Sequence, residues 1–507
     1  MIEVKKRNLK LLSEPIVQPP LATVAGFLTE HKIQSYLVGG FIRDVLLGRD
    51  TADIDIVVTE DALEIAPKAA AMLGGKYVLL DEVNGVGRVV LPGESISPAK
   101  RKWHLDFSTI KGDIETDLAR RDFSIDAMAV DFIQLIKAKA EVQLIDPFSG
   151  RDDLQRGIVR AVSDTTFESD PARLLRAVRL AAELSFTIDS ETEALIKRHH
   201  HLVAGVAGER IREELLRLLA VSKAEQILLY LEELGLLTAL IPELAETKGV
   251  SQPREHFWDV FTHSIQAVAS ADFLLRHGDW QYAGEEVLAI VPWSSKLDKH
   301  FNLEVSSGST RRLLLKLAAL LHDIAKPQTK AVDETGRTRF LGHAIEGANV
   351  VANILERLRF SGKETKLVET MVRHHLRPTQ MAQNELPSQR AIYRYFRDTG
   401  DAGIDILFLS LADHLATRGP RLNLTQWQEH AKIVEYVLTQ RFEQKSLAVP
   451  PKLVDGHDLI NIFGMNPGPK IGEIMETVHE AQSDGELTSR EDALSYIRKY
   501  LLTMVES

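Results

Sequence analysis

The fold of the first part of the chain is decided by two stretches, LVGGFIRDVLLG at 37–48 and DIDIVV at 53–58. The first is an apolar β-type run that turns at two glycines into a helical pattern, and this pattern ends at a third glycine. The second alternates acidic and apolar residues, which is typical of a strand with one buried face. A strand, a helix and a second strand in this order predict an α/β unit.

The alternation at 53–58 places Asp53 and Asp55 on one face of the strand and the isoleucines between them on the other. Two carboxylates this close resist joint ionisation unless a cation lies between them. Mg²⁺ is the natural candidate, because it is usually held by one or two carboxylates and by substrate phosphates. His104 and Asp106 share one face of a later predicted strand, so Asp106 could be a third acid at the same site.

Gly39 and Gly40 end the first strand and begin the helix, which leaves backbone N–H groups available to bind phosphate. Carboxylates, a metal and a glycine turn together indicate nucleotidyl transfer, in which two ions activate a 3′-hydroxyl and hold the departing pyrophosphate in line. A D-x-D pattern alone is short and is usually a solvated edge strand, so the neighbouring motifs decide the interpretation.

Outward from these stretches, β-type runs at 76–80, 87–92 and 103–108 extend the α/β unit to about residue 160. From about residue 165 the apolar residues recur every three to four positions, which predicts a largely helical remainder. Paired prolines at 450–451 indicate a boundary before a last helical segment. We therefore expect four parts, at 1–160, 161–250, 251–440 and 441–507.

The composition is that of an ordinary globular protein, with 507 residues, 44% hydrophobic and 26% charged. The 61 basic and 72 acidic residues give a net charge of −11, which disfavours loose coating of nucleic acid but allows a local basic site. Cysteine is absent, so any metal must use oxygen and imidazole ligands. No apolar run reaches spanning length and no signal peptide is evident, so we expect a soluble, cytoplasmic protein without membrane contact. The oligomeric state is not indicated.

The stretch at 37–48, followed by Asp53 and Asp55, resembles the signature of class II tRNA nucleotidyltransferases and bacterial poly(A) polymerases. DLARRDFSIDAMA at 117–129 resembles the second motif of that family, and the run from Asp146 to Leu154 matches the link that follows it. The resemblance implies a polymerase-beta-like nucleotidyltransferase head with a mixed sheet, then an all-α neck and an all-α HD domain.

The same resemblance implies roles for the residues of both motifs. Asp53 and Asp55 would hold Mg²⁺, and Gly39 and Gly40 would bind the triphosphate. Adjacent arginines make forked contacts to phosphate, and an aspartate accepts a hydrogen bond from a ribose hydroxyl. The other nucleotide-binding candidates of the two motifs are Arg43, Asp117, Arg120, Arg121 and Asp122.

A candidate base-reading group lies at the start of the helix predicted at 170–179. Asp170, Arg173 and Arg176 are spaced by three residues and share one helix face, and Arg179 is a further candidate nucleotide-binding residue. An aspartate accepts from an exocyclic amine, and an arginine donates to a ring nitrogen or carbonyl. Cytosine and adenine offer a donor beside an acceptor, whereas guanine and uracil offer the reverse. The pair could thus select CTP and ATP without a template, and the family reads bases with Asp and Arg here.

Two features depart from the family pattern. Ser169 stands before Asp170 where the family often has Glu, so a carboxylate that could orient Arg173 is missing. The segment 112–116 is short, whereas many CCA-adding relatives have a longer flexible loop there. Members that add only CC have this loop shortened, so CC-only addition remains an alternative.

Histidines and aspartates recur in the helical second half of the chain. Side chains of these types from separate helices form a nitrogen and oxygen site for a divalent metal. The order H…HD…H…HH…D, with Lys326-Pro327 after the HD pair, resembles the HD phosphohydrolase domain. The resemblance implies that His263, His322, Asp323 and Asp413 are ligands of one ion and that His343, His374 and His375 are available for a second.

The metal at this HD site would be Mn, Ni, Co or Fe, or Mg²⁺. Its expected chemistry is attack of activated water on a phosphoester, such as a 2′,3′-cyclic phosphate or a phosphomonoester. For the whole chain we expect template-independent addition of CCA to the tRNA 3′ end from CTP and ATP, with release of pyrophosphate. The alternatives, in order, are CC-only addition, a poly(A) polymerase, and an HD phosphohydrolase with an RNA-binding head.

Overall fold

The computed structural model describes residues 19–91, 103–137, 142–306, 308–381, 386–443, 452–483 and 485–505. The chain forms two compact units, one of Met1–Val206 with Leu234–Ala239 and one of Ala207–Glu233 with Leu240–Ser507. The four domain limits expected from the sequence stay a prediction, and the prolines at 450–451 lie outside the described residues. Within the described part of the chain, helices long and apolar enough to cross a bilayer are absent.

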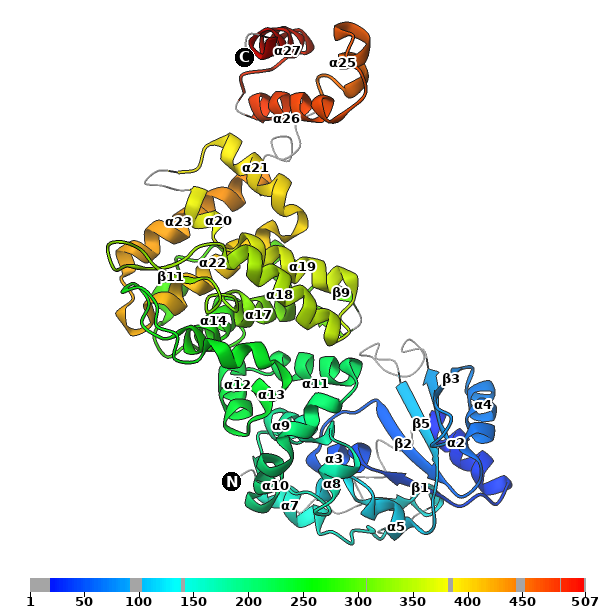
Figure 1. Ribbon diagram of the computed structural model, residues 1–507. Helices are drawn as coiled ribbons and strands as arrows, with labels where there is room; N and C mark the ends of the chain where they lie inside the picture. Colours follow the sequence, from blue (N-terminus) through cyan, green and yellow to red (C-terminus); the bar gives the residue numbers. More distant parts are fainter. Residues whose placement is uncertain are drawn as a thin grey trace. The chain divides into compact units, whose positions relative to one another are not determined.

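The first unit is built on a six-stranded mixed sheet with the order β3-β4-β5-β2-β1-β6 (Figure 1). Only β2 and β5 pair in parallel, and the other neighbours are antiparallel. The mixed sheet and helical remainder confirm the predicted fold class, although the short strand β6 was not expected. The strands are β1 (Ser35–Val38), β2 (Asp53–Val58), β3 (Lys76–Asp81), β4 (Val86–Leu91), β5 (Trp103–Thr109) and β6 (Ala129–Asp131).

One face of this sheet is covered by α4 (Ala62–Leu73), which packs against β3, β4 and β5. A Cβ atom on Gly87 of β4 would lie 3.1 Å from the Cβ of Ala66, so glycine permits the close approach of this helix. Because strand residues alternate, the opposite face of β2, β4 and β5 carries the polar side chains. The other helices near the sheet are α2 (Pro19–Glu30), α3 (Gly40–Leu47), α5 (Ile114–Ala119), η3 (Ser124–Asp126) and α6 (Phe132–Lys137).

The remainder of the first unit is mainly helical. Its central helix α9 (Arg173–Leu184) buries Leu174, Leu175 and Val178 and ends at Ser185, which adopts a left-handed conformation. The strands β7 (Ile158–Val159) and β8 (Thr187–Ile188) form a short parallel pair beside it. The other elements are α7 (Gly150–Arg156), α8 (Thr166–Ser169), α10 (Ser190–His199), η4 (His200–Gly205) and α13 (Leu236–Leu240).

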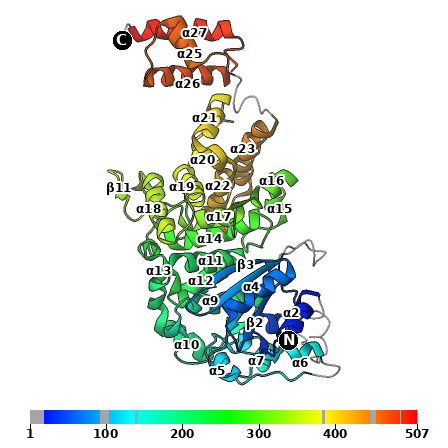
Figure 2. The same ribbon diagram turned by 90° about the vertical axis from the view of Figure 1, so that its right-hand side faces the viewer.

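The second unit is a helical bundle whose centre is α14 (Val260–Leu274), buried along nearly its whole length. This helix is buried on all sides by its neighbours, although it carries a few polar side chains such as His263 and Asp272. It packs against α17 (Arg311–Leu321) and α22 (Gly403–Arg418), and α18 (His343–Arg357) packs along α19 (Gly362–His374) (Figure 2). The flanking elements are α11 (Gly208–Ala220), α12 (Ala224–Glu233), η5 (Pro242–Thr247), α15 (Glu285–Leu288), α16 (Ser295–Phe301), α20 (Arg377–Met381), α21 (Gln389–Thr399), η6 (Gly400–Ala402), η7 (Gly419–Arg421) and α23 (Leu424–Glu443).

Two short antiparallel pairs interrupt this bundle, β9 (Glu304–Ser306) with β10 (Ser309–Thr310) and β11 (Lys330–Val332) with β12 (Thr338–Phe340). The last three helices have an apolar cluster of their own that includes Leu459, Ile474, Val478 and Ile497. These helices are α25 (Gly456–Phe463), α26 (Pro469–Ser483) and α27 (Arg490–Val505).

Two candidate active sites

A row of charged side chains crosses the face of the sheet opposite α4, the open face, in the first unit. The strand register places Asp55 of β2 beside Asp106 of β5, and Asp106 beside Arg88 of β4. Nε of Arg88 donates to Oδ1 of Asp106 and Nη2 donates to Oδ2, both at 2.7 Å. Two residues earlier on both strands, Asp53 pairs with His104, and Nδ1 of His104 lies 2.8 Å from Oδ1 of Asp53. The three predicted carboxylates are therefore brought together on one face.

The glycine turn lies directly beside Asp55, because Val38 at the end of β1 pairs with Asp55 and Gly39 follows it. Gly39 has φ +70, and a Cβ atom there would lie 2.7 Å from Nη1 of Arg121 and 2.8 Å from Oδ2 of Asp55. Glycine is thus required at this position both by the backbone angle and by the close approach of two charged groups. Its successor Gly40 begins α3, so both predicted glycines lie at the site.

The electrostatic environment of Asp55 is unfavourable to its charge. Burial raises the pKa of Asp55 to about 6 against the opposing effect of Arg121, and Asp106 and Asp126 raise it as well. A cation bound beside Asp55 would remove this penalty, since an opposite charge favours the ionised carboxylate. The donor set therefore fits a hard divalent metal held by carboxylates.

Two arginines from different parts of the chain, Arg43 of α3 and Arg176 of α9, converge on Asp126. Nη1 of Arg43 lies 2.7 Å from Oδ1 of Asp126, and Nη2 of Arg176 lies 3.3 Å from its Oδ2. Nε of Arg176 also lies 2.5 Å from Oδ2 of Asp122. Because Asp126 is 2% exposed and lies between two guanidinium groups, these cations hold its pKa low although burial alone would raise it.

The base-reading candidates lie at the start of α9. Oδ1 of Asp170 accepts from the backbone N–H of Ala172 at 3.2 Å, and its Oδ2 lies 3.9 Å from Nε of Arg173. Nη1 of Arg173 donates to Oγ of Ser169 at 3.2 Å, so the serine orients the arginine in place of the expected glutamate. Arg179 is 4% exposed and pairs with Glu183 at 2.7 Å, so the structure places it in the core of the helical part, away from solvent.

Two residues of the second motif complete this site. Nη2 of Arg121 lies 3.6 Å from Oδ2 of Asp117 one helical turn earlier, while Arg120 is exposed. The sequence interpretation missed Arg88 and Asp126. Asp126 could have been noticed as the third acid within DLARRDFSIDAMA, but Arg88 lies in GRVVL, which carries no recognisable signal.

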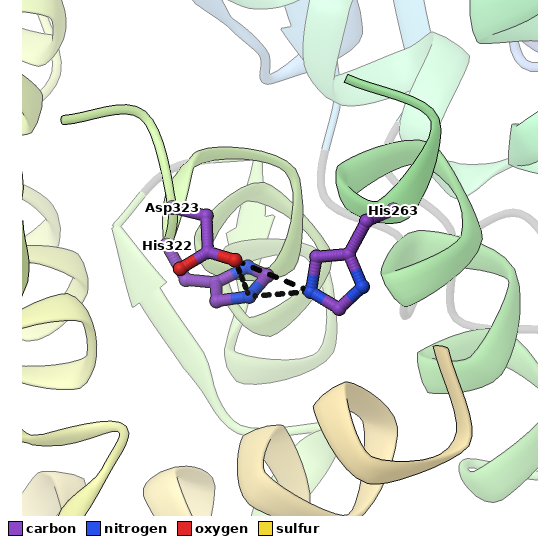
Figure 3. A group of neighbouring side chains, drawn as sticks. All are labelled: His263, His322 and Asp323. Atoms are coloured by element: carbon purple, nitrogen blue, oxygen red, sulfur yellow. Dashed lines mark hydrogen bonds and ion pairs between the residues drawn. The ribbon is translucent and has the colours of Figure 1, made fainter. Parts of the chain in front are cut away.

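The second site lies in the helical bundle, where residues from α14, α18 and α22 meet residues from the turns that follow α17 and α19. Nε2 of His263 lies 3.3 Å from Oδ2 of Asp323 and 3.1 Å from Oδ1 of Asp413 (Figure 3 draws the first pair with His322). Nε2 of His322 lies 3.2 Å from Oδ2 of Asp323 and 3.6 Å from Oδ1 of Asp413. Donors bound at about 2.1 Å to one ion are about 3.0 to 3.4 Å apart, so this spacing suits a divalent metal.

The other oxygen of Asp323 belongs to a second group. Its Oδ1 lies 3.4 Å from Nε2 of His343 and 3.9 Å from Nε2 of His375, and these two nitrogens are 3.3 Å apart. Backbone carbonyls accept from Nδ1 of His322, His343 and His375 at 2.6 to 2.8 Å, which leaves each Nε2 as the metal-binding atom. Asp323 is thus placed to bridge two ions.

The charge states at this second site follow from burial and from the two carboxylates. Burial alone would lower the pKa of His322, but Asp323 and Asp413 raise it to about 10. Burial and the positive charge of His322 lower the pKa of His375 to about 3, so His375 is neutral at physiological pH. A divalent cation would take the place of the proton on His322, because metal-bound imidazole must be neutral.

His374 does not join this cluster. It lines a different cavity with Lys366, Arg373 and Arg397, whereas His375 lines the cavity of the metal group. Consecutive helix residues point about 100° apart, so α19 cannot direct both imidazoles to one point. The cavity at the metal group has a volume of about 490 Å³ and includes the basic side chains of Lys326, Arg337, Arg339 and Arg418 among its lining.

Family models match most of the chain. Residues 35–160 match the poly A polymerase head domain, residues 261–418 match the HD domain, and residues 185–248 match the probable RNA and SrmB-binding site of polymerase A. Residues 340–497 match a putative second domain of tRNA nucleotidyltransferases. The carboxylates and glycine turn of the first site lie within the head-domain segment, and the histidine cluster lies within the HD segment. These matches place the chain among nucleotidyltransferases that carry an HD domain.

Relatives of the whole chain make the assignment narrower. The chain is 33% identical to the A-adding tRNA nucleotidyltransferase of Deinococcus radiodurans, over 92% of this chain and 95% of the relative. It is 32% identical to the CC-adding tRNA nucleotidyltransferase of Geobacter sulfurreducens, over 98% and 99%. The chain therefore belongs to the tRNA nucleotidyltransferase family and is a nucleotidyltransferase. The Thermotoga maritima CCA-adding enzyme complexed with tRNA has the same fold, with 22% identity, a TM-score of 0.58 and coverage of 98% and 99%.

Proposed function

We propose that this enzyme adds C, C and A to the 3′ end of tRNA from CTP and ATP, releases pyrophosphate and uses no template. The observation that carries the proposal is the placement of Asp53 and Asp55 beside the Gly39–Gly40 turn on the open face of the sheet. Such an enzyme acts where tRNA matures, so we also place it in the cytoplasm.

In this proposal Asp53 and Asp55 would hold Mg²⁺, which when bound activates the 3′-hydroxyl and neutralises the departing pyrophosphate. The backbone of Gly39 and Gly40 receives the triphosphate, and Arg121, close to Gly39, adds a guanidinium contact to it. Asp126 keeps Arg43 and Arg176 in fixed positions around the nucleotide. Asp170 and Arg173 read the base, with Ser169 holding the guanidinium.

A second candidate is CC-only addition. The connection between β5 and α5 consists of only Ile110 to Asp113, so the loop associated with the switch from C to A is short. The Geobacter relative is CC-adding and matches almost the whole chain. The Deinococcus relative is A-adding and also matches most of the chain, so A-only addition is a further candidate.

One assay separates these reactions. Three tRNA transcripts, ending before CCA, after C and after CC, are incubated with Mg²⁺ and each nucleoside triphosphate singly. Stepwise addition of C, C and A supports the main proposal. Arrest after CC supports the second candidate, addition of A to the CC transcript alone supports A-only activity, and long A tails indicate a poly(A) polymerase. Absence of extension contradicts all of them.

We further propose that the HD site hydrolyses phosphomonoesters or 2′,3′-cyclic phosphates. The supporting observation is the shared Asp323 carboxylate between two histidine groups in a cavity with basic side chains. Mn, Ni, Co, Fe or Mg²⁺ would be held there and would supply the activated water. Release of phosphate by wild type but not by Asp323→Ala, with tRNA extension unchanged in both, is expected. Equal release by both proteins would contradict the proposal.

A further inference from the structure

Arg88 extends the charged row of the transferase site by one strand beyond the carboxylates. The order across the sheet is Gly39 at the end of β1, Asp55 on β2, Asp106 on β5 and Arg88 on β4. The glycine turn and Arg88 therefore lie on opposite sides of Asp55. The side chain of Arg88 is 33% exposed, so it is accessible on the open face.

This order has a consequence for how RNA approaches. In nucleotidyl transfer the attacking and leaving oxygens lie roughly in line, on opposite sides of the transferred phosphorus. If the triphosphate lies at Gly39 and Gly40, the RNA 3′-hydroxyl must arrive from the β5 and β4 side. Arg88 lies on that side, and two hydrogen bonds of 2.7 Å to Asp106 hold its guanidinium group.

We propose that Arg88 binds the backbone phosphate next to the RNA 3′-terminal hydroxyl and that Asp106 is the positioning residue that holds the guanidinium for this contact. The proposal rests on the proposed roles of Asp53, Asp55 and the glycine turn. It assigns binding of the RNA end, the second substrate, to Arg88, which the sequence did not indicate, and gives Asp106 a supporting role.

The charges of the row support this assignment. Asp53, Asp55 and Asp106 would together repel an incoming phosphodiester, because all three lie on the face that it must reach. A divalent ion offsets the first two, and Arg88 offsets the third. A guanidinium has five N–H donors in a fixed fork, of which two serve Asp106 and the others suit the oxygens of a phosphate.

A purely structural role for Arg88 would be to neutralise Asp106, and a test must separate the two roles. Ligated tRNA is prepared with an uncharged methylphosphonate in place of the last internucleotide phosphate, and single-turnover addition of the next nucleotide is measured. In wild type the neutral linkage should lower the rate at subsaturating RNA about 10- to 100-fold, the range for a hydrogen bond between charged groups.

Arg88→Ala should lower the rate on ordinary tRNA by a similar factor and show almost no additional loss on the neutral linkage. Arg88→Gln and Asp106→Asn should also be less sensitive than wild type to the neutral linkage, although the change should be smaller than for Arg88→Ala. These two variants keep the test valid if the alanine variant does not fold. The apparent KM for the nucleoside triphosphate should change little. The proposal would be overturned if the neutral linkage lowered the rate of Arg88→Ala by the same factor as it lowers the rate of wild type.

Lys68→Ala is the matched control, because Lys68 is an exposed cation on α4, which covers the other face of the sheet. It should respond to the neutral linkage as wild type does. Asp53→Asn and Asp55→Asn separate the two levels of the argument. If these variants remain active, the proposed metal ligands are wrong. If they are inactive, but Arg88→Ala and wild type lose the same factor on the neutral linkage, only the role of Arg88 is wrong.

Discussion

Nη2 of Arg173 donates a hydrogen bond of 2.8 Å to the backbone carbonyl oxygen of Arg120. This bond joins the start of α9 to the two-arginine motif that follows α5, both within the first unit. Nη1 of Arg173 is held in addition by Oγ of Ser169 and by the carbonyl oxygen of Thr166. The guanidinium is thereby fixed before any nucleotide binds, as a base-reading group should be.

Asp170→Ala and Arg173→Ala should blur the discrimination among nucleotides. Each removes one side of a donor and acceptor pattern worth about 1 to 3 kcal/mol, so the preference for CTP over UTP should fall roughly 10- to 100-fold. Single-nucleotide addition with each of the four triphosphates measures this preference. Ser169→Ala should have a smaller effect, because two carbonyl oxygens still hold Arg173. Unchanged selectivity in both main variants would remove the base-reading role.

Gly39→Ala should abolish activity, whereas Gly74→Ala should reduce stability only. Both glycines have positive φ, so alanine costs about 1 to 2 kcal/mol at either position. A Cβ atom at Gly74 meets nothing within 4 Å, but at Gly39 it meets Arg121 and Asp55. Melting temperatures and kcat/KM for tRNA extension separate the two effects. Comparable activity losses in the two variants would show that strain alone is responsible.

The sequence predicted the transferase site where a motif is local and failed where contacts cross the sheet. Asp53, Asp55 and the glycines lie within twenty residues, and the strand period alone placed the two carboxylates on one face. Arg88 reaches Asp106 only through the β4–β5 register, which no local pattern encodes. The strand β6 was missed for the same reason, because its three residues are apolar or acidic and derive their strand pairing from β1.

Asp55→Asn should stabilise the metal-free enzyme. The folded-state pKa of Asp55 is about 6, against an ordinary value of 3.8, so the folded protein binds more protons than the unfolded chain in this range. Stability therefore falls as pH rises from about 4 to 6 and stays lower above it. At pH 8 with EDTA the variant should gain about 3 kcal/mol, or several degrees in melting temperature.

The pH dependence of this gain checks its cause. At pH 5 the Asp55 carboxyl is mostly protonated in the folded protein, so the advantage of the amide should be distinctly smaller than at pH 8. Mg²⁺ should also reduce the stability difference between the variant and wild type, because it stabilises only the wild-type carboxylate. A gain that is independent of both pH and Mg²⁺ would mean that the amide acts through packing.

The HD site was also predictable in part. The chain order of histidines and aspartates indicated which residues meet, because they recur on or at the ends of several separate helical runs. It did not distinguish His374 from His375, since only the rotation of α19 about its axis decides which imidazole faces Asp323. The second oxygen of Asp323 as a shared ligand likewise appears only in three dimensions.

Metal content should respond differently to the two neighbouring histidines of α19. His375→Ala removes a neutral imidazole beside Oδ1 of Asp323, so Mn²⁺-loaded protein should retain about half of the tightly bound metal after desalting. His343→Ala should do the same, because it removes the other nitrogen of that group. His374→Ala should retain the wild-type content, since His374 lines a different cavity. Elemental analysis after desalting measures the ratio of Mn to protein. Asp323→Ala should lose both ions, because one carboxylate serves both groups. Equal metal loss in the His374 and His375 variants would contradict this division.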